Sequence, residues 1–98
     1  MVQQLETWSV LRGRVRAVAD DAQRADFRTL SLDLDDVGGA EGFAAAVDAS
    51  SAGSVVEIAI PRDTADAIGL EPGKHIELHA RLTPAGLFAH PDRTRIVD

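Results

Sequence analysis

Hydrophobic and polar residues alternate along much of this chain with the period of two that is typical of half-buried β-strands. In residues 10–19, VLRGRVRAVA, the small and apolar side chains fall on one face of the predicted strand. Gly13 lies in the middle of that strand and indicates a bulge or a tight bend. The opposite face carries three arginines: Arg12, Arg14 and Arg16. The first strand is therefore predicted to bury one face and to expose a row of cations.

Four more segments complete a predicted sheet of five strands. Residues 27–34, FRTLSLDL, place three leucines on one face and Phe27 on the other. The β-branched run VVEIAI, residues 55–60, and the alternating run HIELHARL, residues 75–82, follow. The fifth strand starts with LFAH at residue 87 and closes with RTRIV.

A short helix is predicted between the third and fourth strands, over residues 62–69, RDTADAIG. Asp63 is a candidate N-cap residue, and Ala65 and Ile68 are expected to face the core. Gly69 suits the left-handed position after the last helical residue. The turn EPGK then reverses the chain into the fourth strand.

Residues 35–54, DDVGGAEGFAAAVDASSAGS, form a predicted insertion of small and acidic residues. Phe43 and Val47 lie four residues apart and could anchor a short helix, but Gly42 weakens it. A mobile loop is the alternative for this segment.

The turn TPAG, residues 83–86, decides the register of the last hairpin. A two-residue loop would place Phe88 on the outer surface, opposite Arg81. A type I turn with a left-handed Gly86 is typical of a three-residue loop with a bulge. We predict the three-residue loop, which turns Phe88 inward opposite Leu82.

Five strands with a helix between the third and the fourth have the order of the OB-fold. The sequence therefore predicts an all-β fold, a five-stranded OB-like β-barrel with one short helix between strands 3 and 4. A chain of 98 residues is too short for two cores, so residues 1–98 are predicted to form a single domain. Closing the sheet would pair the strand edges of this small domain.

The segments LRGRVRAV and VVEIAIPRDTADAIGLEPGKHIELHARLTPAGLFA resemble the small TOBE/Mop barrels of molybdate-handling proteins over residues 11–89. Those barrels share a glycine-marked first strand and a strand–helix–GLxPG–strand unit. Residues 60–91 also resemble the swapped-hairpin DNA-binding domain of transition-state regulators and antitoxins, which does not need the first two strands. The end of the chain, PGKHIELHARLTPAGLFAHPDRTRIV, is similar to phage single-stranded DNA-binding OB proteins. The TOBE/Mop resemblance implies an oxyanion site between subunits, although LETWSVLRG stands where those proteins carry S-A-R-N.

The formal net charge of −6 argues at first against a partner made of phosphates. Residues 20–48 carry eight acidic and two basic side chains, so this segment alone accounts for the excess. The remainder is balanced, and its arginines lie near the two ends of the chain. A basic surface is therefore compatible with the composition.

The leading hypothesis is a non-catalytic protein that binds single-stranded DNA or RNA through a basic strand face. Outward arginines on one strand are about 6–7 Å apart, which is close to the spacing of successive phosphates on an extended strand. OB-type grooves combine such cations with aromatic side chains on which bases stack. The predicted nucleic-acid-binding residues are Arg12, Arg14, Arg16, Phe27, Lys74, Arg81, Arg93 and Arg95.

Each part of this hypothesis has a structural alternative. The arginines could form a cross-strand ladder of ion pairs with Asp33, Glu57 and Glu77, which also point outward by phase. Phe27 could cover one end of the barrel, and Trp8 is expected to pack against its flank.

Other chemistry has little support in the sequence. Cysteine is absent, which excludes disulfides and thiolate metal sites. His75 and His79 imitate a metal motif, but on a strand they would lie about 13 Å apart. No nucleophile motif and no Walker lysine occurs, so we expect no enzyme activity, no metal site and no cofactor.

Two other functions are carried as alternatives: a molybdate-type oxyanion binder, and a protein-interaction module or subunit of a larger assembly. Another protein chain, including a second copy in a homo-oligomer, is therefore a candidate partner. The N-terminus shows no signal-peptide pattern. No apolar run approaches the roughly 20 residues of a membrane span. We therefore expect a cytoplasmic protein without membrane contact.

Overall fold

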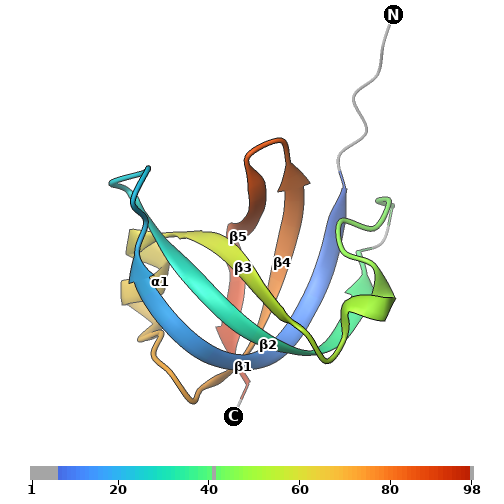
Figure 1. Cartoon of the computed structure of the whole chain (residues 1–98), viewed down its shortest axis with the longest axis horizontal. Coiled ribbons are helices and arrows are strands. Elements are labelled where there is room, and N and C mark those ends of the chain that lie inside the picture. Colours follow the sequence, from blue (N-terminus) through green and yellow to red (C-terminus); the bar gives the residue numbers. More distant parts are fainter. Residues whose placement is uncertain (1–6, 41, 98) are drawn as a thin grey trace, which may run out of the picture.

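A computed structural model describes residues 7–40 and 42–97 of the chain. Within these ranges, five strands and two short helices follow one another (Figure 1). They are β1 (Trp8–Asp20), β2 (Phe27–Gly39), the 3₁₀ helix η1 (Ala49–Ser51), β3 (Val55–Pro61), α1 (Arg62–Ile68), β4 (His75–Thr83) and β5 (Gly86–Ile96). Neither helix in this described part has the length and apolar content that crossing a membrane requires. The predicted order of five strands with a helix between the third and fourth is confirmed.

The strands close into a barrel in the order β1-β2-β3-β5-β4, and β4 pairs back to β1. The neighbouring strands are antiparallel except for β3 and β5, which run parallel. Parallel neighbours need a crossover connection. The chain between β3 and β5 provides it, because it passes through α1 and β4 (Figure 1). This closed barrel has the predicted fold class and is compatible with an OB-like fold.

Aliphatic side chains fill the interior of the barrel. Alternate residues of a strand point to the same side of the sheet, and the inward ones are buried. The largest of them are Leu11, Val15, Leu30, Leu32, Leu34, Ile58, Ile60, Ile76 and Leu78. Full burial of such a side chain contributes about 1.5–3 kcal/mol. The described core contains no aromatic side chain.

β1 bends where the sequence predicts a bulge. Its register with β2 shifts between Arg12 and Gly13. A Cβ atom on Gly13 would overlap the carbonyl oxygen of Asp33, so glycine allows β2 to approach β1 closely at this point. A second register shift with β2 follows between Val15 and Ala17.

α1 begins directly after β3, with Pro61 at the N-cap position and no side-chain capping bond. The prediction that Asp63 caps the helix is therefore wrong, because the helix starts earlier and Asp63 lies inside its first turn. A carboxylate there still interacts favourably with the positive end of the helix dipole. Gly69 ends the helix with φ of 68°, as predicted, and Ala65 is buried.

The insertion is shorter than the predicted range of 35–54. Residues 35–39 continue β2, and residues 36–39 pair with β1. Aspartate is depleted in strands, so the two aspartates at 35–36 do not predict that β2 continues. Pairing with β1 stabilises this part of the strand. Residues 43–47 form no helix, and Val47 anchors the segment at 7% exposure.

The predicted register of the last hairpin is also wrong. Thr83 pairs with Gly86, which leaves a two-residue loop. The Thr83 hydroxyl accepts a hydrogen bond from the N–H of Ala85 at 3.1 Å and donates one to the carbonyl of Gly86 at 3.0 Å. These two bonds stabilise the tight turn, and Gly86 has the positive φ expected of it, 118°.

The register change reverses two side-chain predictions. Phe88 lies opposite Arg81 on the outer surface instead of facing the core. Leu82, which was expected to point into the core, is 55% exposed. It lies opposite Leu87, one pair before the turn of the β4–β5 hairpin, and Figure 1 shows this hairpin at the top of the molecule.

Candidate nucleic-acid interface

Closure of the barrel brings side chains from both ends of the sequence onto one outer surface. The outward partners in the β1–β4 ladder are Arg14 with His75, Arg12 with Glu77, Val10 with His79 and Trp8 with Arg81. In the β4–β5 ladder, Arg95 lies opposite Glu77 and Phe88 lies opposite Arg81. This surface, formed by the outward side chains of three adjacent strands, is the β1–β4–β5 face.

Glu77 occupies the middle of the β1–β4–β5 face and binds two arginines. Arg12 Nε lies 2.6 Å from Oε2, and Arg95 approaches Oε1 with Nε at 3.1 Å and Nη2 at 3.0 Å. The hydrogen bonds from Arg12 and then from Arg95 lower the pKa of Glu77, although partial burial opposes them. One carboxylate therefore compensates two guanidinium groups.

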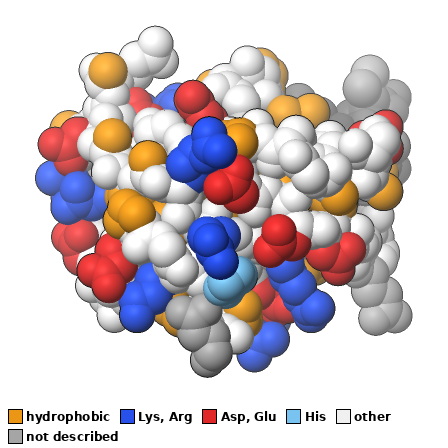
Figure 2. Space-filling model, turned by 60° about the horizontal axis from the view of Figure 1, so that its bottom comes forward, with side chains coloured by type: hydrophobic (Ala, Val, Ile, Leu, Met, Phe, Trp, Pro, Cys, Tyr) orange, Lys and Arg blue, Asp and Glu red, His pale blue; other side chains and the backbone are white. Residues whose placement is uncertain are grey.

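The ladder of ion pairs that competes with nucleic-acid binding is present in part. Arg16 Nε lies 3.3 Å from Asp33 Oδ2, on the side of β1 that faces β2. Within the described residues, Arg14 and Arg93 have no ion pair. Figure 2 accordingly shows basic and acidic side chains alternating over the surface rather than separated by sign. Neutralisation is thus incomplete along the first strand.

All four aromatic residues of the chain lie outside the core. The rings of Phe27 and Phe88 are 5.6 Å apart, edge to face, and those of Trp8 and Phe43 are 6.3 Å apart. Arg81 connects the two pairs, because it lies opposite Phe88 in one ladder and opposite Trp8 in the other. These five residues form the aromatic row.

Arg24 extends the aromatic row into the loop between β1 and β2. Its guanidinium carbon lies 4.8 Å from the ring centre of Phe88 and 6.0 Å from that of Phe27, which are cation–π distances. Asp21 holds the guanidinium group at 3.2 Å. The pKa of Asp21 is lowered, first by the N–H of Gln23 and also by Arg24.

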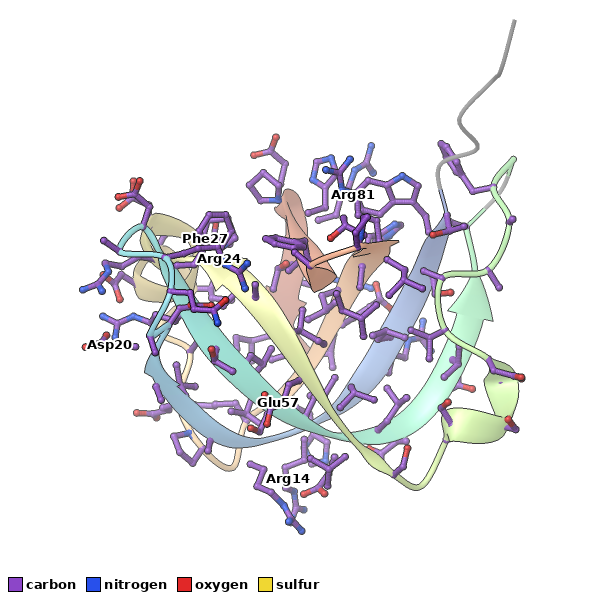
Figure 3. The ribbon with its side chains drawn as sticks, turned by 45° about the horizontal axis from the view of Figure 1, so that its top comes forward. Arg14, Asp20, Arg24, Phe27, Glu57 and Arg81 are labelled. Carbon is purple, nitrogen blue, oxygen red and sulfur yellow. The ribbon has the colours of Figure 1, made fainter. Side chains whose placement is uncertain are left out.

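The predicted residues do not all meet in one place. Five of them lie on the β1–β4–β5 face: Arg12, Arg14, Arg81, Arg93 and Arg95. Phe27 belongs to the aromatic row, and Figure 3 shows it with Arg24 at the upper rim, far from Arg14. Lys74 lies beside Val15 just before β4, and its ammonium group is 3.9 Å from Glu71.

The structure adds four residues that the sequence did not assign to the site: Trp8, Arg24, Phe43 and Phe88. Phe88 was not assigned to the site because the predicted hairpin register turned it toward the core. Arg24 lies in a loop, where no periodic pattern applies. The one local signal for Arg24 is its spacing of three residues from Asp21, which suits an ion pair.

A hollow of about 620 Å³ lies where the aromatic row meets the insertion. Its lining consists of Trp8, Val10, Gly39, Ala40, Phe43, His79, His90 and Arg93. Across residues 7–40 and 42–97, no group of three or more histidine and acidic side chains is placed to hold a metal ion.

No protein-family model matches the chain, and no curated protein sequence matches it. The likeness to TOBE/Mop barrels and to phage single-stranded DNA-binding proteins therefore remains a resemblance carried by the quoted segments. The closed five-stranded barrel is what the structure establishes.

Proposed function

We propose that this protein is a non-catalytic binder of single-stranded nucleic acid. In this proposal the strand crosses the aromatic row and lies along the β1–β4–β5 face. The observation that carries it is the position of every aromatic side chain outside the core, in a row with arginine. Aromatic side chains bury about 150–250 Å² each in a core, and this chain fills its core without them.

Stacking on surface aromatics is how proteins hold single strands with little sequence preference, at about 1–3 kcal/mol per base. Trp8 and Phe88 lie on the two strands that flank β4, so they are roughly 10 Å apart, two strand spacings. Arg81 lies between them. Neighbouring bases can therefore stack on the two rings while the arginine contacts a phosphate that joins them.

The β1–β4–β5 face supplies the remaining phosphate contacts. Among the described residues of this face, five arginines stand with two carboxylates, Glu77 and Asp92. Two loops, residues 21–26 and 84–85, flank the Phe27–Phe88 pair. The corresponding loops of OB barrels contact oligonucleotides, which supports the same placement here.

Fluorescence anisotropy with a labelled oligothymidylate tests the phosphate contacts. We expect binding at low salt that weakens as salt rises, because each phosphate contact contributes about −0.7 to the slope of log K against log salt. Arg14→Gln should reduce the magnitude of that slope by about 0.7. It should leave the fold intact, since Arg14 has no ion pair with any described residue. Arg62→Gln on α1 removes one positive charge away from this face and is the control for charge, although it also breaks the ion pair of Arg62 with Asp20.

Phe88→Ala tests the stacking contacts in the same assay. Phe88 is half-buried at the surface. We expect the affinity of the variant to fall by at least about fivefold, whereas Val97→Ala, at an exposed apolar position, should change little. Absence of binding at low salt, or an unchanged affinity of Phe88→Ala, would overturn the proposal. Heat on titration with molybdate but not with sulfate would favour the oxyanion function instead, and a blank result in both assays would favour a protein partner.

A further inference from the structure

The hollow beside the insertion has two chemically different walls. The aromatic and apolar wall consists of Trp8, Val10 and Phe43, and the polar wall consists of His79, His90 and Arg93. The two walls meet at one side, where the ring centres of Trp8 and His90 are 5.4 Å apart. No acidic side chain lines the hollow among the described residues. Its volume of about 620 Å³ falls within the range of small-molecule pockets, roughly 300–1,000 Å³.

The aromatic wall is fastened to the barrel through the main chain. The N–H of Trp8 donates to the carbonyl of Ala44 at 2.9 Å. Ser9 Oγ, which is fully buried, accepts from the N–H groups of Ala46 and Val47 at 2.9 and 3.1 Å. These bonds tie the insertion to β1 and keep Phe43 beside the indole ring.

The polar wall comes from β4 and from an irregular part of β5. The β4–β5 register shifts between Leu78 and Ala80, which displaces the segment that carries His90 and Arg93. The N–H of Asp92 donates to Nδ1 of His90 at 3.0 Å. Nδ1 of His90 therefore acts as an acceptor, and Nε2 is the ring nitrogen left to contact a ligand. Arg93 has no ion pair with any described residue, so its charge is available to an anion.

We infer that this hollow binds one nucleotide, with its base against Trp8 and Phe43 and its phosphate against Arg93 and His79. A nucleoside monophosphate joins a flat aromatic group to a dianion, which is the combination that the two walls accommodate. The inference rests on the proposed function, because the hollow lies at the end of the aromatic row and would hold the last nucleotide of a bound strand.

Isothermal titration calorimetry with three separate probes tests this inference: thymidine monophosphate, thymidine and inorganic phosphate. We expect thymidine monophosphate to bind. Thymidine and phosphate should each bind at least about tenfold more weakly, since each engages only one wall.

Two variants and a control locate the binding. Arg93→Gln and Phe43→Ala should each weaken thymidine monophosphate by at least about fivefold. Both side chains are exposed, so neither change disturbs the core. Phe27→Ala, at the far end of the aromatic row, should weaken oligothymidylate but leave the mononucleotide affinity unchanged.

The outcomes separate this inference from the proposed function. Oligothymidylate binding without mononucleotide binding overturns the inference and leaves the proposed function standing. Equal affinities for thymidine and its monophosphate, or an unchanged affinity in Arg93→Gln, also overturn the inference. Mononucleotide binding that depends on Arg93, without oligonucleotide binding, supports the inferred pocket and overturns the proposed function.

Discussion

At Gly13, β2 approaches β1 too closely to leave room for a side chain. The bulge there needs the space that a side chain would fill, because a Cβ atom would overlap the carbonyl oxygen of Asp33 in β2. We expect Gly13→Ala to lower the free energy of unfolding by about 3 kcal/mol, measured by urea denaturation. Gly39→Ala is the matched control, since a Cβ at Gly39 meets no atom within 4 Å. Equal stabilities of the two variants would show that the bulge does not require glycine.

Glu77 makes stability depend on pH in a defined direction. Its pKa is lowered below the ordinary 4.5 by Arg12 and Arg95, so the folded state binds its proton less tightly than the unfolded state does. The stabilisation is therefore complete above about pH 4.5 and is lost as the pH falls through the lower, folded pKa. We expect the stability difference between wild type and Glu77→Gln to disappear over that interval in urea melts. A difference that persists at all acidic pH values would contradict this account.

The same residue limits the charge that the β1–β4–β5 face presents to a polyanion. Glu77→Gln should free Arg12 and Arg95, at a cost of about 1 kcal/mol in folding stability. We expect the salt slope of oligonucleotide binding to steepen by about 0.7–1.4 units, one contact for each released arginine. Asp35→Asn removes the same charge from β2 and should leave the slope unchanged.

At the residue scale, the sequence predicted which side chains point outward but not which of them meet. The period of two placed Arg12, Arg14 and Arg16 on the outer face. The strand pairing agrees for Arg12 and Arg14, and Arg16 is exposed at the second register shift. Whether each charge is cancelled depends on register. A shift of two residues in the β1–β4 ladder would set Arg14 rather than Arg12 opposite Glu77, with the same faces buried.

At the scale of the elements, hydrogen bonds to the Ser9 hydroxyl hold the segment between β2 and β3 against β1. Ser9→Ala would remove the acceptor of two N–H groups, that of Val47, which is buried, and that of Ala46, which is partly buried. Loss of the partner of a buried N–H group costs about 1–3 kcal/mol. We expect faster amide hydrogen exchange at Ala46 and Val47 in this variant, with little change in β3. Ser31→Ala, on the outer side of β2, is the control. Unchanged exchange at both amides would show that the serine does not hold the segment.

The strands, the helix and its Gly69 end were predictable because local patterns specify them. The end of β2 was not, since pairing with β1 stabilises residues 36–39 against their weak strand preference. The hairpin loop was also missed. Its two-residue form depends on hydrogen bonds of the Thr83 side chain, which turn statistics do not include.

At the scale of the whole molecule, barrel closure creates the candidate site. β1 and β4 are separated by most of the chain, yet their pairing sets Trp8 beside Arg81 and Arg12 beside Glu77. The OB-like strand order was enough to predict that the first strand lies beside the later ones. It was not enough to predict the aromatic row, which also requires the outward position of Phe88 and the attachment of Phe43 to β1.

An NMR titration of the isotopically labelled protein with oligothymidylate tests the central claim most directly. The account predicts that chemical-shift changes concentrate on the Trp8 indole, on Arg81 and Phe88, and along the outer residues of β1, β4 and β5. Chemical-shift changes confined to α1 and to residues 33–36 of β2, or no chemical-shift changes at low salt, would contradict the account.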